Sequence, residues 1–170
     1  MEWTQSDSEL YRQLSAIAVP ARAEQLATLL TLIPFAEDDS FKVVELASGE
    51  GHLSAAILEA FPDATVLSLD FEETMRETTS KRLSAYDGRF SIGAFDMLTD
   101  DWFDLLNGAD LVISSLCIHH LDSEGKKGLF EAVQSRLSDK GAFLIADLVL
   151  PKNAQARELF ATTWDSVAES

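Results

Sequence analysis

The sequence has little of several residue types that define whole classes of protein. It contains one cysteine, Cys117, which excludes an internal disulfide and a metal cluster built from cysteines. No apolar run approaches the ~20 residues that a membrane-spanning helix needs. The first seven residues are acidic and polar, unlike a secretory signal peptide. We therefore expect a cytoplasmic protein that does not enter a membrane.

Basic residues are also scarce. Lysine and arginine number 13 against 29 aspartates and glutamates, which gives a formal net charge of −16. An acidic excess of this size repels phosphate backbones, so we expect no nucleic acid among the partners. The simplest remaining explanation of the acidity is solubility.

What is present is the composition of an ordinary folded domain. Hydrophobic residues make up 46% of the chain and charged residues 25%. A chain of 170 residues can bury about 70% of its unfolded surface, enough to fold without a disulfide or a metal. Neither an internal repeat nor a long Gly/Ser-rich or Pro-rich linker interrupts it. We expect a single domain over residues 1–170.

Hydrophobic periodicity divides this domain into an arm and a core. Residues 1–40 form a helical N-terminal arm, with helices expected at 6–18 and from Pro20 to about residue 32. In the core, residues 41–150, strands are expected at 41–46, 65–70, 89–94, 109–116 and 142–146. Helices are expected at 52–61, 72–85, 101–106 and 122–137, with a turn at 139–141. A last helix, within 151–170, begins at Pro151.

This alternation predicts an α/β fold. Five mostly parallel strands form a doubly wound sheet with helices on both faces. In such sheets, ligands bind at the carboxyl ends of the strands, near the point where the strand order reverses. Residues that follow the strands are therefore the first place to search for a site.

A glycine-containing turn follows the first strand. The run ELASGEGH, residues 45–52, joins that strand to the next helix. Gly49 and Gly51 allow tight turning and close approach of a ligand, and the helix start adds free N–H groups. Glu45 and Glu50 would repel a pyrophosphate and would suit an ammonium group. An ordinary strand-to-helix turn that happens to contain glycines is the alternative.

Acidic residues follow the next two strands. Asp70 lies 19 residues after Gly51, an offset at which a carboxylate can accept both hydroxyls of a ribose. Asp96 can accept a hydrogen bond from an exocyclic amine, and Met97 can lie against a flat ring. Both aspartates could instead cap the segments that follow them.

The order of these motifs resembles that of the class I S-adenosylmethionine-dependent methyltransferases. The run at 45–51 resembles the family's acidic-x-Gly-x-Gly-x-Gly loop, Asp70 the ribose-binding acid, and Asp96 with Met97 the adenine-binding pair. Residues 109–121 resemble the fourth-strand segment of the small-molecule methyltransferases. Residues 140–147 resemble the fifth strand and its approach turn. The resemblance covers residues 41–150.

The resemblance implies S-adenosylmethionine as cofactor, S-adenosylhomocysteine as product, and in-line transfer of a methyl group to a small-molecule acceptor. In the arm, Tyr11 and Arg22 would cover the cofactor, unless they are surface residues of their helices. The cofactor-binding residues implied are Glu45, Ala47, Ser48, Gly49, Gly51, Asp70, Phe71, Asp96, Met97, Ser115, Arg22 and Tyr11.

The chain departs from the family pattern in two places. Ala47 replaces the first glycine of the loop, a small change if its φ is negative. The two antiparallel strands that follow strand five in the family are also missing. The chain is then a piece of a longer one or a naturally shortened form, or a partner supplies the edge. We expect the last helix or a second copy, in a homodimer, to cover the exposed edge strand.

His119 and His120 are the candidates for catalysis. Either could act as a general base toward an acceptor hydroxyl or amine. Either could equally be structural, since methyl transfer from a sulfonium needs little beyond alignment. Two adjacent histidines point in different directions and no third ligand is evident, so we expect no metal site.

Two other functions compete with methyl transfer. A nicotinamide-dependent oxidoreductase would share the fold, but its G-x-G-x-x-G fingerprint requires a third glycine where Ser54 stands. A non-catalytic binding or regulatory module would keep the fold and lack an acceptor pocket. No Asn-Pro-Pro-aromatic stretch follows the fourth strand, which argues against the branch of the family that methylates amide or base nitrogens.

Overall fold

The structure, a computed structural model, describes residues 21–168. The helix expected at 6–18 and Tyr11 lie outside these residues. The described chain divides into two compact units, residues 28–147 and residues 21–27 together with 148–168. Helix α2 (Arg22–Leu32) spans the first boundary, and α6 (Ala154–Ala168) follows the second. The other elements all belong to the unit 28–147, which also contains most of the candidate site.

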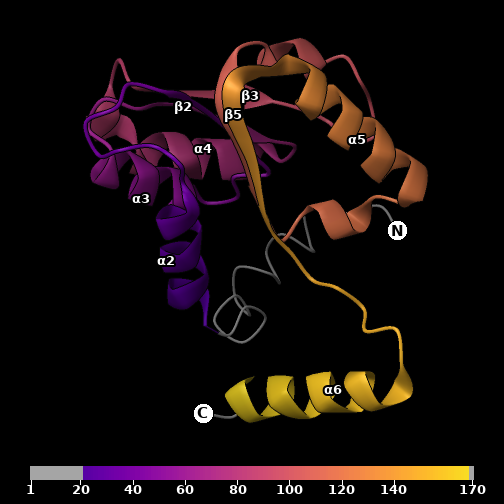
Figure 1. The fold of residues 1–170 in the computed structure, drawn as a ribbon. Coiled ribbons are helices and arrows are strands. Elements are labelled where there is room, and N and C mark those ends of the chain that lie inside the picture. Colours follow the sequence, from indigo (N-terminus) through magenta and orange to yellow (C-terminus); the bar gives the residue numbers. More distant parts are fainter. Residues whose placement is uncertain (1–20, 169–170) are drawn as a thin grey trace. The chain divides into compact units, whose positions relative to one another are not determined.

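Five parallel strands form the centre of that unit (Figure 1). In the order in which they pair they are β3 (Phe90–Ala94), β2 (Thr65–Asp70), β1 (Lys42–Leu46), β4 (Ala109–Ser115) and β5 (Leu137–Ala146). The strand order reverses between β1 and β4, and all four pairings are parallel. The predicted five-stranded, doubly wound sheet is confirmed, and the described residues contain no antiparallel pair.

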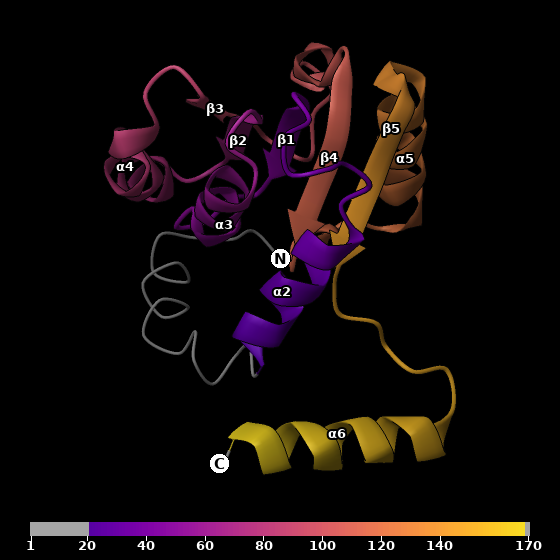
Figure 2. The same cartoon turned by 60° about the vertical axis from the view of Figure 1, so that its left-hand side comes forward.

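Helices cover both faces of the sheet. α3 (His52–Ala60) and α4 (Glu73–Arg82) follow β1 and β2, whereas α5 (Ser123–Arg136) joins β4 to β5. Right-handed crossovers that run in opposite directions from the centre place α3 and α4 on one face and α5 on the other, as Figure 2 shows. Three short 3₁₀ turns complete the unit, namely η1 (Ser84–Tyr86), η2 (Phe103–Leu106) and η3 (Ile118–His120).

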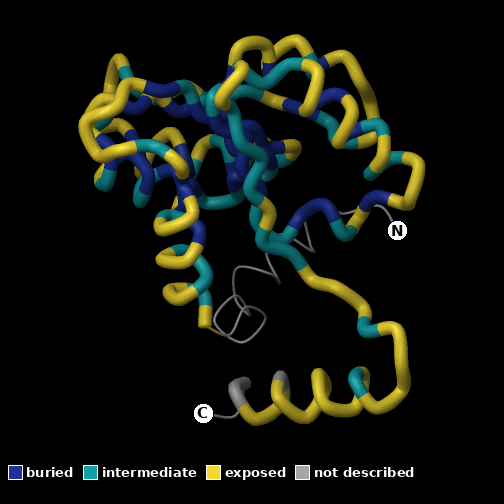
Figure 3. Tube along the Cα trace, viewed as in Figure 1, coloured by how far each residue is buried: buried dark blue, intermediate teal, exposed yellow. Residues whose placement is uncertain are grey.

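The core lies along the central strands. Figure 3 shows the buried residues concentrated there, because parallel strands covered on both sides expose neither face. Residues of β1 alternate between the two layers. Val44 and Leu46 pack in one cluster with Leu129 and Val133 of α5, whereas Glu45 reaches Ser54 of α3.

Residues 139–141, expected to form a turn before the last strand, instead belong to β5. β5 begins at Leu137, and its register with β4 shifts between Ala109 and Leu111. Ser138 donates a hydrogen bond to Asp110 at 2.7 Å, and the backbone N–H of Lys42 donates to the same carboxylate at 2.9 Å. These long-range contacts hold the irregular stretch in the sheet, so a local turn signal misplaced the start of the strand.

Candidate functional site

The turn after β1 has a left-handed backbone at every second residue. Ala47, Gly49 and Gly51 have φ values of 56°, 55° and 76°. The condition under which alanine would be a small change at this position, a negative φ, is therefore not met. A methyl side chain in this region costs about 1–2 kcal/mol relative to the right-handed form. The turn keeps this strain because its backbone is fixed by bonds to neighbouring strands.

Hydrogen bonds tie the turn to the end of β2. Ser48 N–H donates to the carbonyl of Leu69 at 3.0 Å, and Gly49 N–H donates to Asp70 Oδ2 at 2.7 Å. The other oxygen of Asp70 accepts from Glu72 N–H at 3.0 Å. Asp70 thus fixes the backbone just before α4, whose N-cap residue is Glu72, and also holds the glycine turn. Each oxygen keeps a second lone pair that a ribose hydroxyl could use.

Burial shapes the chemistry of Asp70. Its side chain belongs to the buried set, and removal from water raises the pKa of the carboxyl above its ordinary value. The amides of Gly49 and Glu72 and the guanidinium of Arg76 act in the opposite direction. A partly dehydrated carboxylate held by two amides is rigid, which suits the recognition of a diol.

Glu45 lies beneath the turn. It is buried, and its carboxylate accepts from the hydroxyl of Ser54, which lies 2.7 Å from the hydroxyl of Ser68. These contacts join β1, α3 and β2 through one polar cluster.

Two observations show that the turn can accept a ligand. A Cβ built on Gly49 would meet no heavy atom within 4 Å, so the space beside it is open. The hydroxyl of Ser48 is buried without a hydrogen-bond partner among the described residues, and such groups are rare unless something else bonds to them. Both residues belong to the cofactor set that the resemblance implied, and a polar cofactor would fit here.

Cys117, which follows β4, lies beside one of the residues expected at the adenine. Its thiol lies 3.8 Å from the sulfur of Met97, one of the two residues expected at the adenine. Burial, and then the negative charges of Asp70 and Asp147, raise the pKa of Cys117 to about 12. Asp70 ends β2, Cys117 follows β4 and Asp147 follows β5, so these residues of parallel strands lie at the same edge of the sheet. Asp96 also accepts from Leu98 N–H at 2.9 Å, a contact within the turn that follows β3.

His119 is held by an aspartate at the end of β5. Its Nδ1 lies 2.6 Å from Asp147 Oδ1, and its backbone N–H donates to Oδ2 at 3.0 Å. An ionised carboxylate only accepts, so Nδ1 carries the proton and Nε2 is left to accept one. The ring of His120 lies 4.1 Å from that of His119, between centroids. Partial burial and then His119 lower the pKa of His120.

Sequence reasoning missed Asp147 as a site residue. The signal was present, because Asp147 directly follows β5 just as Asp70 ends β2. Of the other expected residues, Ser115 ends β4 and is half-buried, and Phe71 follows β2 with its ring exposed. Arg22 belongs to the other unit. The roles assigned to these three residues stay predictions.

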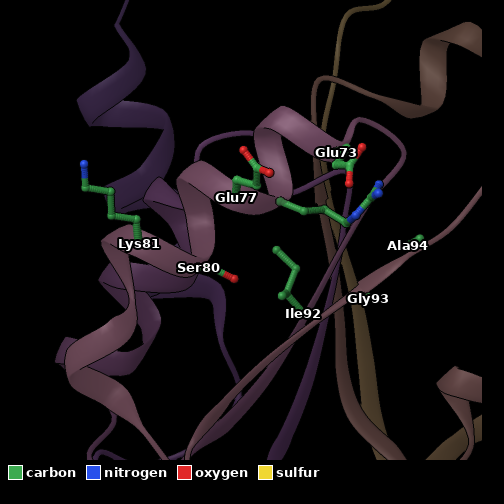
Figure 4. A pocket seen from close by; sticks show the side chains of 8 residues that line it. Glu73, Glu77, Ser80, Lys81, Ile92, Gly93 and Ala94 are labelled. Atoms are coloured by element: carbon green, nitrogen blue, oxygen red, sulfur yellow. The ribbon is translucent and has the colours of Figure 1, made fainter.

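A separate hollow of about 590 Å³ lies between α4 and β3 (Figure 4). Glu73, Glu77 and Lys81 of α4 line it together with Ile92 and Gly93 of β3. None of the site residues expected from the sequence lines it. In the part of the chain that the structure describes, no three histidine, cysteine or acidic residues are grouped to hold a metal, and no helix has the length and hydropathy to cross a membrane.

Comparisons with known proteins agree with this geometry. YrrT of Bacillus subtilis (strain 168), described as an uncharacterized methyltransferase, is 34% identical over 116 residues, which cover 67% of this chain and 50% of YrrT. An O-methyltransferase family protein from Burkholderia thailandensis superposes with a TM-score of 0.69 at 20% identity, over 95% of this chain and 48% of that one. CalO1, a methyltransferase of calicheamicin biosynthesis solved in its SAH-bound form, gives 0.68 at 16% identity, over 96% and 46%.

The chain thus spans about half the length of each of these three proteins. The two solved structures share its fold. The model of one family, described as a methyltransferase domain, matches residues 44–143. That match covers most of the sheet, the glycine turn and the segment that carries His119, and the chain belongs to this methyltransferase domain family.

Proposed function

We propose that this domain binds S-adenosylmethionine and transfers its methyl group to a hydroxyl or amine of a small molecule. The observation that supports the proposal is the position of Asp70, Cys117 and the His119–Asp147 pair at the ends of the parallel strands β2, β4 and β5, and therefore at one edge of the sheet. Asp70 suits the binding of an adenosyl cofactor. The His119–Asp147 pair suits removal of a proton from an acceptor.

The residues divide the work between cofactor and acceptor. Asp70 would hold the ribose hydroxyls, Met97 would lie against the adenine, and Ser48 would bond to the methionine part. Glu45 is close to the same turn and favours the cationic amine. When bound, the cofactor supplies an electrophilic methyl group on a sulfonium.

On the acceptor side, His119 Nε2 would take the proton of the hydroxyl or amine as the acceptor forms its bond to the methyl carbon. The bond from that carbon to sulfur would break with its electron pair left on sulfur, which would give S-adenosylhomocysteine. Asp147 keeps the tautomer that makes Nε2 the acceptor and stabilises the imidazolium that forms. The proposal of a small-molecule acceptor rests on the acidic net charge, which disfavours nucleic acid, and on the likeness to CalO1.

Calorimetric titration tests the cofactor. Wild-type protein and Asp70→Ala are titrated with S-adenosylmethionine, S-adenosylhomocysteine and, as a control dinucleotide, NADH. We expect micromolar binding of the two adenosyl ligands, lost in the variant, and no response to NADH. Binding of NADH alone would contradict the proposal, and so would adenosyl binding that Asp70→Ala leaves intact.

A panel of phenols, alcohols and amines then tests the reaction, with S-adenosylhomocysteine as the detected product. Turnover that depends on one class of acceptor supports methyl transfer. Cofactor binding without turnover on any acceptor favours the non-catalytic module.

A further inference from the structure

The glycine turn is fastened on two sides, and only one of them involves a residue of the expected cofactor set. The carboxylate of Asp70 accepts a hydrogen bond from the N–H of Gly49. The carbonyl of Gly49 accepts one from the hydroxyl of Thr79, at 2.7 Å. Thr79 lies on α4 and is fully buried. Both polar backbone atoms of Gly49 are therefore fixed by side chains from different elements.

Thr79 also fills the space beside the next glycine. A Cβ built on Gly51 would lie 2.7 Å from Thr79 Cγ2, closer than real carbon atoms approach. The methyl group of Thr79 thus packs against Gly51 while its hydroxyl bonds to Gly49. Shape and hydrogen bonding together set the position of α4 relative to the turn.

The direction of the Gly49 carbonyl has a consequence for the ligand side. The peptide between Gly49 and Glu50 is trans and planar, so its N–H points opposite to its C=O. Because Thr79 draws the carbonyl toward α4, the N–H of Glu50 points away from that helix. Arg82 holds the next carbonyl, that of Glu50, at 2.7 Å in a more exposed bond.

We propose, on the basis of the proposed function, that Thr79 is a positioning residue for the cofactor: it presents the Glu50 amide to the ligand and thereby sets the affinity for the amino-acid part of S-adenosylmethionine and S-adenosylhomocysteine. Without the Thr79 hydroxyl, the part-buried Gly49 carbonyl loses this hydrogen bond, and rotation of the peptide toward water would replace it. Rotation would turn the amide away from the ligand. Thr79 itself touches no cofactor.

The test compares variants that separate hydroxyl from bulk. Thr79→Val keeps the shape and removes the hydroxyl, whereas Thr79→Ser keeps the hydroxyl and removes the methyl. Thr78→Val is the matched control, since Thr78 lies on the same helix and bonds only to the carbonyl of Thr74 in its own helix, at 2.8 Å. Affinity for S-adenosylhomocysteine is measured by calorimetry under conditions where circular dichroism shows each variant to be folded.

We expect Thr79→Val to bind about tenfold more weakly, equivalent to about 1.4 kcal/mol. Thr79→Ser should bind with an affinity within about threefold of the wild type, a difference of less than about 1 kcal/mol. Thr78→Val should bind as tightly as the wild type. A merely structural role would lower the stability of Thr79→Val without this pattern of affinities. Equal affinity of Thr79→Val and Thr78→Val would overturn the proposal. If Thr79→Val does not fold, Thr79→Ala and Thr79→Ser make the same comparison.

A ligand-free measurement keeps this inference separate from the proposed function. The amide signals of Glu50 and Gly51 and their hydrogen exchange are recorded by NMR in the wild type, Thr79→Val and Thr78→Val. Faster exchange and shifted signals in Thr79→Val alone support the proposed positioning role of Thr79. Unchanged amides in Thr79→Val overturn it. Failure of the wild type to bind any adenosyl ligand counts against the proposed function.

Discussion

The carboxylate of Asp147 binds His119 twice, through the ring Nδ1 at 2.6 Å and through the backbone N–H at 3.0 Å. One aspartate therefore fixes both the position of the residue and the rotation of its imidazole. Leu116, which precedes His119 in the segment after β4, makes a second contact to the end of β5. Its N–H donates to the carbonyl of Ala146 at 2.8 Å, and its φ is 57°, a value that bulky residues rarely adopt. The corner after β4 is thus held against the end of β5 next to His119, the proposed general base.

The first prediction concerns this pair. His119→Gln should lower kcat for methyl transfer by about 10²–10⁴-fold, the usual range for loss of a general base. Asp147→Asn should lower it by about 10²-fold or more, because the amide favours the wrong tautomer of the ring. His120→Gln should have a smaller effect than either. Steady-state kinetics check this. Full activity in His119→Gln would mean that alignment of the acceptor alone drives the reaction.

The second prediction concerns the strained turn. Ala47→Gly should raise the free energy of unfolding by about 1 kcal/mol, because glycine adopts the positive φ without steric cost. Ala55→Gly, the same change inside α3, should lower it by about 0.5–1 kcal/mol. Urea denaturation of both variants measures the two signs. A loss of stability in Ala47→Gly would show that the turn relaxes without strain.

The third prediction concerns the thiol of Cys117. With its pKa raised to about 12 by burial and two carboxylates, it stays protonated at pH 8. A disulfide reagent should label the folded protein far more slowly than the urea-unfolded chain, in which this one cysteine is exposed. Rapid labelling of the folded protein would contradict the buried position.

The raised pKa also links stability to pH. In the unfolded chain the thiol loses its proton near its ordinary pKa of 9.0, whereas the folded chain keeps it up to about 12. The folded form binds the proton more tightly, so this stabilisation is complete below pH 9 and is lost as the pH rises toward 12. The slope is up to about 1.4 kcal/mol per pH unit. Cys117→Ala should show a shallower decline over the same range.

The fourth prediction concerns Arg89, which binds the end of α3. Its guanidinium donates to the carbonyls of Leu58, Phe61 and Ala64 at 3.1–3.3 Å. Charged donors at a helix end stabilise it, so Arg89→Met should cost about 1–3 kcal/mol of unfolding free energy. Lys127→Met, which removes only an exposed 3.9 Å ion pair with Glu131, should change it by less than about 0.5 kcal/mol. Equal effects in a denaturation experiment would show that the Arg89 contacts contribute nothing.

The sequence alone determined the order of the elements and the edge of the sheet that bears the site. Apolar runs and helical periodicity predicted all five strands in their order along the chain, with only the start of β5 misplaced, because parallel strands buried on both faces must be continuously apolar. Residues that follow those strands had to lie at one edge, which is why Gly49, Asp70 and Asp96 could be expected at the same side of the sheet. The homodimer and the cytoplasmic location stay predictions.

Only the tertiary structure decided what depends on contacts far apart in the chain. Ala47 takes a positive φ because the hydrogen bonds from Ser48 and Gly49 to β2 outweigh a local preference. β5 begins five residues before the expected strand, because Asp110 and β4 hold the stretch that reads as a turn. Asp147 joins His119, and Thr79 joins Gly49, across 28 and 30 residues of sequence. Local patterns specify which faces are buried, whereas the partner of a single polar group is set by the packing of whole elements.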